Sequence, residues 1–211
     1  MKLYLNATSP YARAVRIAAI ENQLDQTLEL VWVDPWQSPE ALLAVNPAAK
    51  IPVLVTDAGA PITETLNILF YLDQQAPNGP QLLSPLPSHP QSLTLLGYGQ
   101  ALMDATFQTV IARKHDGNRA DQHELGQRRI QAIHRLLAAI DHHLRDHQNH
   151  LRDERHLTQT GIPICDVVIG IALAYLDFRL SEIPWRSDFP ALADWMESVE
   201  ARESFAVTRF K

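Results

Sequence analysis

Two patterns of apolar residues divide the chain. Up to residue 75, short apolar segments alternate with helical stretches, whereas after residue 90 the apolar residues recur only at helical spacing. Between them lie Pro77, Pro80, Pro85, Pro87 and Pro90, a spacing that no regular element tolerates. We therefore predict a first domain over residues 1–77, a proline-rich linker over 78–90 and a second domain over 91–211.

The first domain alternates strands and helices. Apolar segments predict strands at residues 2–5, 28–33, 51–55 and 61–62. Capping residues and helical spacing predict three helices. They begin at Pro10 after the cap Ser9, at Pro39 after the cap Ser38, and at Glu64 after the cap Thr63. The order β-α-β-α-β-β-α predicts an α/β domain, a small sheet with helices packed on its faces.

The second domain is predicted to be all helical. Helices are expected at residues 91–113, 121–149, 164–180 and 191–200, with a break at 116–118 and a loop between Pro184 and Pro190. The third of these helices is apolar nearly all round, which predicts that it forms the buried centre of a bundle.

Composition excludes several classes of protein. The 211 residues are 46% hydrophobic and 20% charged, an ordinary globular balance, and the formal net charge is −6 with no basic block. A nucleic-acid partner is therefore not expected, since such proteins cluster Lys and Arg. The longest apolar run, near Val167–Leu176, is too short to span a membrane. The single cysteine, Cys165, and the absence of a signal-peptide pattern fit a cytoplasmic protein.

Three short motifs carry candidate chemistry. Ser9-Pro10 is a helix start whose free amides and helix dipole favour an anion. Pro52 interrupts a strand, which usually marks an edge or a bend. Glu64 and Thr65 open a helix with an acid in its first turn. Each motif alone fits an ordinary cap, a trans proline or a capped helix.

Together, in this order, the motifs resemble those of the cytosolic glutathione S-transferase family. The resemblance extends to the linker and to the C-terminal segments Tyr175–Arg179 and Arg202–Phe205, which are similar to bacterial members. It implies a thioredoxin-like first domain and a helical second domain. Ser9-Pro10-Tyr11-Ala12 stands where related redox proteins carry Cys-Pro-Tyr-Cys, so dithiol chemistry is not expected there.

The resemblance also implies roles in glutathione binding. Pro52 matches the family's cis-proline, and the Ile51 backbone would pair with the cysteinyl backbone of glutathione. Glu64 would hold the γ-glutamyl ammonium, Thr65 its carboxylate, and Lys50 would approach the glycyl carboxylate. Ser9 would then hydrogen-bond the sulfur and favour its thiolate. Thr8 and Tyr4 remain alternative hydroxyl donors.

The same resemblance implies an activity and partners. Glutathione is expected as a co-substrate that attacks a small hydrophobic electrophile, with no permanently bound cofactor and a role in detoxification. The electrophile site is predicted from Tyr11, Trp36, Tyr98, Met103 and Phe107, although core packing remains the alternative for each helical residue. A homodimer is expected, with Asp104 reaching glutathione on the partner subunit. A non-catalytic binding module and a glutathione-dependent isomerase remain alternatives.

Two further patterns are left open by the sequence. His143 and His147 stand four residues apart, as in some metal pairs, but their charged neighbours favour an exposed helix face, and no metal is predicted. Asp166 matches the acid of the family's capping box, but Pro163 occupies the position of the usual cap hydroxyl.

Overall fold

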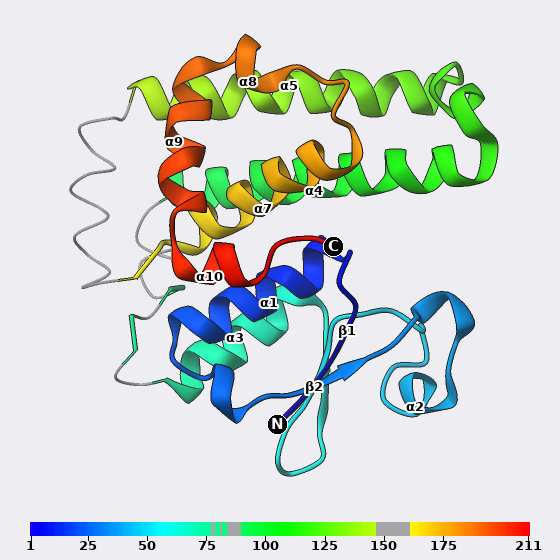
Figure 1. Cartoon of the computed structure of the whole chain (residues 1–211), viewed down its shortest axis with the longest axis vertical. Helices are drawn as coiled ribbons and strands as arrows, with labels where there is room; N and C mark the ends of the chain where they lie inside the picture. Colours follow the sequence, from blue (N-terminus) through cyan, green and yellow to red (C-terminus); the bar gives the residue numbers. More distant parts are fainter. Residues whose placement is uncertain (77–78, 81, 84–89, 147–160) are drawn as a thin grey trace.

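The structure, a computed structural model, describes residues 1–76, 79–80, 82–83, 90–146 and 161–211 (Figure 1). It contains a small sheet with helices in the first part of the chain and a bundle of helices in the second. The predicted fold class, thioredoxin-like α/β followed by all-α, is confirmed. The predicted linker, 78–90, lies mostly outside the described residues, so the domain boundaries stay predictions.

Four strands form the sheet in the order β2-β1-β3-β4. β1 runs parallel to β2 and antiparallel to β3, and β3 runs antiparallel to β4. Leu3 in β1 stands between Leu30 and Leu54 of the neighbouring strands. The strands are β1 (Lys2–Leu5), β2 (Glu29–Trp32), β3 (Val53–Val55) and β4 (Pro61–Thr63).

The alternation of buried residues in β1 explains how the sheet binds its helices. Leu3 and Leu5 are fully buried, because successive side chains of a strand point to opposite faces. They pack in one cluster with Val15 of α1 (Pro10–Glu21) and Ile68 of α3 (Thr65–Gln75). α1 and α3 lie side by side (Figure 1). Short helices complete this part: η1 (Asp25–Thr27), η2 (Pro35–Gln37) and α2 (Glu40–Leu43).

Several predicted element bounds in the first part were wrong by a residue or two. Ser38 does not cap α2: Pro39 is its N-cap, and the helix begins at Glu40. The strand predicted from Ile51 begins at Val53, since Pro52 has no N–H to donate to a ladder. Thr63 does not cap α3: it is the last residue of β4, and Glu64 occupies the cap position without a side-chain cap bond. α3 therefore begins at Thr65.

The second part consists of helices. Its longest members are α4 (Pro90–Asp116), α5 (Glu124–Asp146) and α7 (Ile164–Arg179), followed by α8 (Trp185–Asp188), α9 (Pro190–Glu200) and α10 (Glu203–Val207). The 3₁₀-helix η4 (Gly117–Asp121) follows α4 at the predicted break. The predicted loop between Pro184 and Pro190 was wrong, since it contains α8. The predicted end of the second helix, 147–149, lies outside the described residues.

α7 is the centre of the bundle, as its apolar sequence predicts. Its residues from Ile164 to Leu173 are all buried. α4 approaches α7 closely at Gly99, where an added Cβ would lie 3.0 Å from the Ile169 side chain. Over the described residues, no helix combines the length and the apolarity that a bilayer span requires.

Two sets of contacts join the sheet domain to the bundle. Ala14, Ile17 and Ala18 of α1 share a core with α7. Glu21, at the end of α1, accepts hydrogen bonds from Arg202 Nε (3.0 Å) and Nη2 (2.6 Å), and also from Ser204 Oγ (2.6 Å). A bidentate pair fixes the relative orientation of its two side chains and is stronger than a single hydrogen bond.

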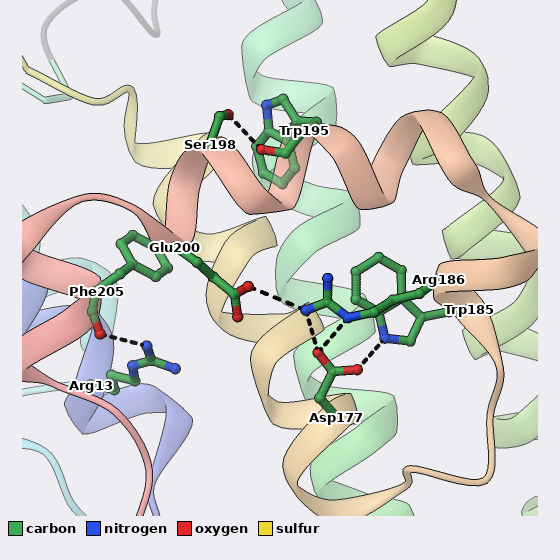
Figure 2. Close-up of polar contacts among 8 residues, drawn as sticks. All are labelled: Arg13, Asp177, Trp185, Arg186, Trp195, Ser198, Glu200 and Phe205. Atoms are coloured by element: carbon green, nitrogen blue, oxygen red, sulfur yellow. Dashed lines mark hydrogen bonds and ion pairs between the residues drawn. The ribbon is translucent and has the colours of Figure 1, made fainter.

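Asp177 ties the last helices of the bundle together (Figure 2). Its carboxylate accepts hydrogen bonds from Trp185 Nε1 (2.7 Å) and Arg186 Nη2 (2.7 Å), and Arg186 also reaches Glu200 at 3.3 Å. These bonds join α7, α8 and α9.

Candidate functional site

The sheet register brings the three sequence motifs to one end of the sheet. Tyr4 of β1 stands opposite Val53 of β3, which stands opposite Thr63 of β4. Since β3 is antiparallel to both neighbours, the end of β1, the beginning of β3 and the end of β4 lie at the same end of the sheet. Residues 6–9, 51–52 and 64–65 adjoin these three strand ends.

Ser9 is the N-cap of α1, as predicted. Its backbone is extended, and its Oγ accepts a hydrogen bond from the Ala12 N–H at 3.1 Å, while Pro10 fills the first helical position. Ser9 is half-buried. Its hydroxyl keeps one proton to donate, because the cap bond uses only an oxygen lone pair.

Asn6 shapes the turn before Ser9, a role that the sequence analysis missed. Its Oδ1 accepts hydrogen bonds from the backbone N–H of Ser9 (2.8 Å) and of Thr8 (3.1 Å). The Thr8 hydroxyl donates to the same oxygen at 3.4 Å. An asparagine directly after a strand is the signal that pointed to such a turn.

The segment before β3 has the predicted cis bond between Ile51 and Pro52. Pro52 is buried and Ile51 is half-buried. Buried Asn46, also missed from the sequence, supports this segment: its Nδ2 donates to the Lys50 carbonyl at 2.9 Å, and its Oδ1 accepts from the Ala48 N–H at 3.1 Å. Among the described residues, the Ile51 backbone makes no hydrogen bond.

Glu64 has an unusual backbone conformation for a residue with a side chain. Its φ is +66° and its ψ is 130°, and its side chain is exposed. Positive φ in a non-glycine residue costs on the order of 1–3 kcal/mol, and such residues concentrate at functional sites. Thr65 follows as the first residue of α3 and is half-buried.

Tyr11 links this end of the sheet to the bundle. Its hydroxyl donates a hydrogen bond to the Asp104 carboxylate of α4, and its ring meets the Phe107 ring edge-on at 5.4 Å. Burial, then the hydrogen bond and charge of Asp104, raise the pKa of the Tyr11 phenol. The charge of Glu64 acts in the same direction, so Tyr11 stays neutral beside the candidate site.

The other predicted electrophile residues are dispersed. Trp36 lies in η2 and is exposed, with Lys114 Nζ 4.5 Å from the centre of its ring and the His115 ring 6.3 Å away. Tyr98 is half-buried against the large core. Met103 is 2% exposed and belongs to that core, so its side chain offers no surface to a ligand.

Comparisons with known proteins match both halves of the chain. The family model "Glutathione S-transferase, N-terminal domain" matches residues 8–75, and "Glutathione S-transferase, C-terminal domain" matches residues 124–198. A solved glutathione S-transferase from Methylobacterium radiotolerans, in complex with glutathione sulfonate, is 30% identical with a TM-score of 0.81, covering 100% of this chain and 95% of its own. The chain belongs to the glutathione S-transferase family.

Two further relatives align over nearly the whole length of the chain. A glutathione transferase family member from Pseudomonas fluorescens Pf-5, solved with bound glutathione, is 28% identical with a TM-score of 0.81, covering 100% of this chain and 98% of its own. The uncharacterized GST-like protein YibF of Escherichia coli K12 is 28% identical over 99% of this chain and 98% of its own.

The N-terminal glutathione S-transferase match includes all three motifs at this end of the sheet, since residues 8–75 contain Ser9, Pro52 and Glu64. The motifs offer the Ser9 hydroxyl, the peptide group of Ile51 and the Glu64 carboxylate. Such a set suits a short peptide that carries an ammonium group and an anion.

The sequence left open a histidine pair, His143 and His147, and the cap before Asp166; the structure describes part of each. His143 lies on α5 and is half-buried, whereas His147 lies outside the described residues. Within the ranges that the structure describes, no three His, Cys, Asp or Glu residues gather as a metal site would require. Pro163 is the N-cap of α7 without a side-chain bond, and Asp166 is buried in the first turn, where Cys165 Sγ approaches it at 3.8 Å.

Proposed function

We propose that this member of the family is a glutathione transferase in which the Ser9 hydroxyl stabilises the glutathione thiolate. One observation carries the proposal: the sheet brings three motifs together at one of its ends, namely Ser9, Ile51–Pro52 and Glu64–Thr65. Relatives solved with glutathione and with glutathione sulfonate support glutathione as the ligand.

Glutathione is proposed to bind as a short extended strand beside Ile51, at this end of the sheet. The Ile51 N–H and C=O pair with the cysteinyl backbone of the ligand, which places its sulfur toward Ser9. The exposed Glu64 carboxylate binds the γ-glutamyl ammonium, while the Thr65 hydroxyl and the first amides of α3 bind the γ-glutamyl carboxylate. Lys50 is exposed beside Ile51 and approaches the glycyl carboxylate.

Ser9 acts as a hydrogen-bond donor and not as a nucleophile. A free thiol has a pKa of about 8.5, so little thiolate exists at neutral pH. A hydrogen bond from Ser9 and the positive end of the α1 dipole both favour the anion and lower that pKa. The thiol proton passes to solvent, the sulfur forms a bond to the electrophilic carbon, and the leaving group departs with its electron pair.

The electrophile is proposed to lie between the start of α1 and the bundle. Tyr11 and Phe107 present aromatic edges there, and Asp104 holds the Tyr11 hydroxyl. Trp36 with Lys114 supplies a further exposed aromatic surface, on the side of η2.

Chlorodinitrobenzene conjugation tests the proposal directly. Ser9→Ala is expected to lower turnover on the order of a hundredfold, the size typical of one lost stabilising donor. Thr8→Ala and Tyr4→Phe are matched controls that remove the competing hydroxyls, and they are expected to retain most activity. Loss of turnover in either control, with Ser9→Ala active, moves the role to that residue.

Two alternatives are distinguished by the same assays. A non-catalytic binding module binds glutathione in calorimetry without conjugating any of a broad panel of electrophiles. A glutathione-dependent isomerase regenerates free glutathione and forms no conjugate. Retention of Ser9, Glu64 and a hydroxyl at Thr65 favours the transferase.

We further propose a cytoplasmic homodimer. Phe70 of α3 and Leu93 of α4 are large apolar side chains that are 55% and 46% exposed, which favours a covered surface in an assembly. Asp104 is proposed to reach glutathione on the partner subunit, in competition with its bond to Tyr11. Light scattering of wild type and of Phe70→Glu tests the dimer: the variant is expected to be monomeric.

A further inference from the structure

A cavity that is open to solvent lies between the start of α1, the end of β2 and the C-terminal segment. Figure 1 shows the C-terminus beside the start of α1. Ser9 lines this cavity, and so do four cationic side chains: Arg13, Arg16, Arg209 and Lys211. The described residues of its lining include no Asp or Glu side chain.

Arg13 is a buried, fixed positive charge in the wall of this cavity. It is 6% exposed, and its guanidinium donates to the Phe205 carbonyl (3.2 Å) and to Thr208 Oγ1 (3.3 Å), while it lies 4.6 Å from the centre of the Phe210 ring (Figure 2 shows the Phe205 bond). All these partners are neutral. Burial lowers the pKa of Arg13 to about 10, which leaves the group charged at neutral pH.

The charges around Arg13 are mostly of the same sign. After burial, the charge of Glu200 has the largest effect and raises the pKa of Arg13, while Arg16 and Arg209 each lower it. Glu200 is itself paired with Arg186 at 3.3 Å. Among the described residues, no carboxylate lies within ion-pair distance of Arg16 or Arg209. An anion in the cavity would relieve this repulsion.

Trp32 adds an apolar wall to the cationic one. It lies at the end of β2, is 54% exposed, and the Arg16 guanidinium carbon lies 5.8 Å from the centre of its ring. An aromatic face beside arginines suits a small organic acid better than an inorganic ion, because the ring covers the ligand's carbon skeleton.

We propose that this cavity binds the carboxylate of the electrophilic substrate, so that the enzyme prefers electrophiles that are organic acids. The inference rests on the proposed function, because it is Ser9 that places the reacting sulfur beside the cavity. The step is a substitution: the glutathione sulfur bonds to the carbon, chloride leaves with its electron pair, and the carboxylate stays on the arginines unchanged.

A matched pair of aryl chlorides tests this preference. 4-Chloro-3,5-dinitrobenzoate and 4-chloro-3,5-dinitrobenzamide share the reacting carbon and differ in charge. After division by the uncatalysed rates, we expect kcat/KM to favour the acid about tenfold at low ionic strength, and less as added salt screens the arginines. Equal values for the two substrates overturn the proposal.

Variants then assign the preference to the cavity. Arg16→Gln and Arg209→Gln are each expected to lower the acid-to-amide ratio about fivefold, the size of one partly screened charge. Arg135→Gln, on the exposed surface of α5, is the control that should keep the ratio. If Arg16→Gln lowers both substrates by one factor, the arginines act on the thiolate and the proposal is wrong. Arg13 is left intact because it anchors the C-terminal segment.

Binding of 4-nitrobenzoate without glutathione separates the two proposals. Calorimetry should detect binding to wild type and its loss in Arg16→Gln. If this binding is found but neither aryl chloride is conjugated, the transferase function fails and the anion site stands. If both chlorides are conjugated equally and nitrobenzoate does not bind, the anion site fails and the transferase function stands.

Discussion

The Tyr11 hydroxyl, in the first turn of α1, donates a hydrogen bond to the Asp104 carboxylate in the middle of α4. This bond crosses from the sheet domain to the bundle directly beside the candidate site. It fixes the Tyr11 ring against Phe107, in the wall of the proposed electrophile site.

Removal of this bond is expected to lower the stability slightly and to release the Tyr11 ring from its fixed position. Tyr11→Phe keeps the ring and removes the hydroxyl. Since Asp104 is solvent-exposed, we expect the free energy of unfolding to fall by about 1 kcal/mol. Urea unfolding measures this change. No loss of stability in Tyr11→Phe would mean that the bond contributes nothing in solution.

The same pair predicts a dependence of stability on alkaline pH. Burial and Asp104 raise the pKa of Tyr11 in the folded protein above its unfolded value of about 10. Its contribution is therefore complete below about pH 10 and is lost as the pH rises further, because the unfolded chain then releases a proton that the folded protein keeps. The difference in unfolding free energy between wild type and Tyr11→Phe should be the same at about pH 8 and about pH 9 and smaller at about pH 10.5. A constant difference would contradict the raised pKa.

The positive φ of Glu64 is expected to lower the stability of the fold, while its carboxylate contributes to ligand binding. Glu64→Gly relieves the positive φ and should raise the free energy of unfolding by about 1 kcal/mol, while it weakens glutathione binding through loss of the carboxylate. Gln23→Gly is the matched control, because Gln23 has a φ of +58° at the far end of α1. This control should gain similar stability and keep its affinity for glutathione in calorimetry. Unchanged glutathione affinity in Glu64→Gly would remove Glu64 from the site.

Ser9 has a structural role besides the proposed chemical one. Ser9→Ala removes the acceptor of the Ala12 N–H and should cost about 1 kcal/mol in unfolding free energy. Ser9→Asp keeps a cap acceptor but has no hydroxyl proton at neutral pH, so it should retain stability and lose turnover. Thermal unfolding with conjugation assays separates the two roles. Full turnover in Ser9→Asp would exclude a donor role for this residue.

The ion pair between Glu21 and Arg202 is expected to couple the domains. It is bidentate, and the Glu21 side chain is only 10% exposed. A double-mutant cycle with Glu21→Gln and Arg202→Gln should give a coupling of about 2 kcal/mol. The exposed pair Lys2–Glu29, at 3.5 Å, is the control and should give less than about 0.5 kcal/mol. Equal couplings in the two cycles would show that burial adds nothing.

Features that depend on neighbouring residues followed from the sequence. The cap at Ser9 and the strand at β1 rest on side chains within a few positions, and they were found where the pattern predicts them. The cis bond at Pro52 followed from the resemblance to the family and is confirmed. The misplaced start of α3 arose because the positive φ of Glu64 is a backbone choice that no spacing signals.

The assembly of the site was decided by tertiary structure. Met103 and Phe107 stand one helical turn apart on α4, and the sequence treats them alike. The bundle buries Met103, whereas Phe107 meets Tyr11 from the other domain. The basic cavity likewise joins Arg16 to Arg209, from opposite ends of the chain. Periodicity reports which face of an element is apolar, but only packing determines what that face touches, because long-range contacts depend on the register of the sheet and the docking of the helices.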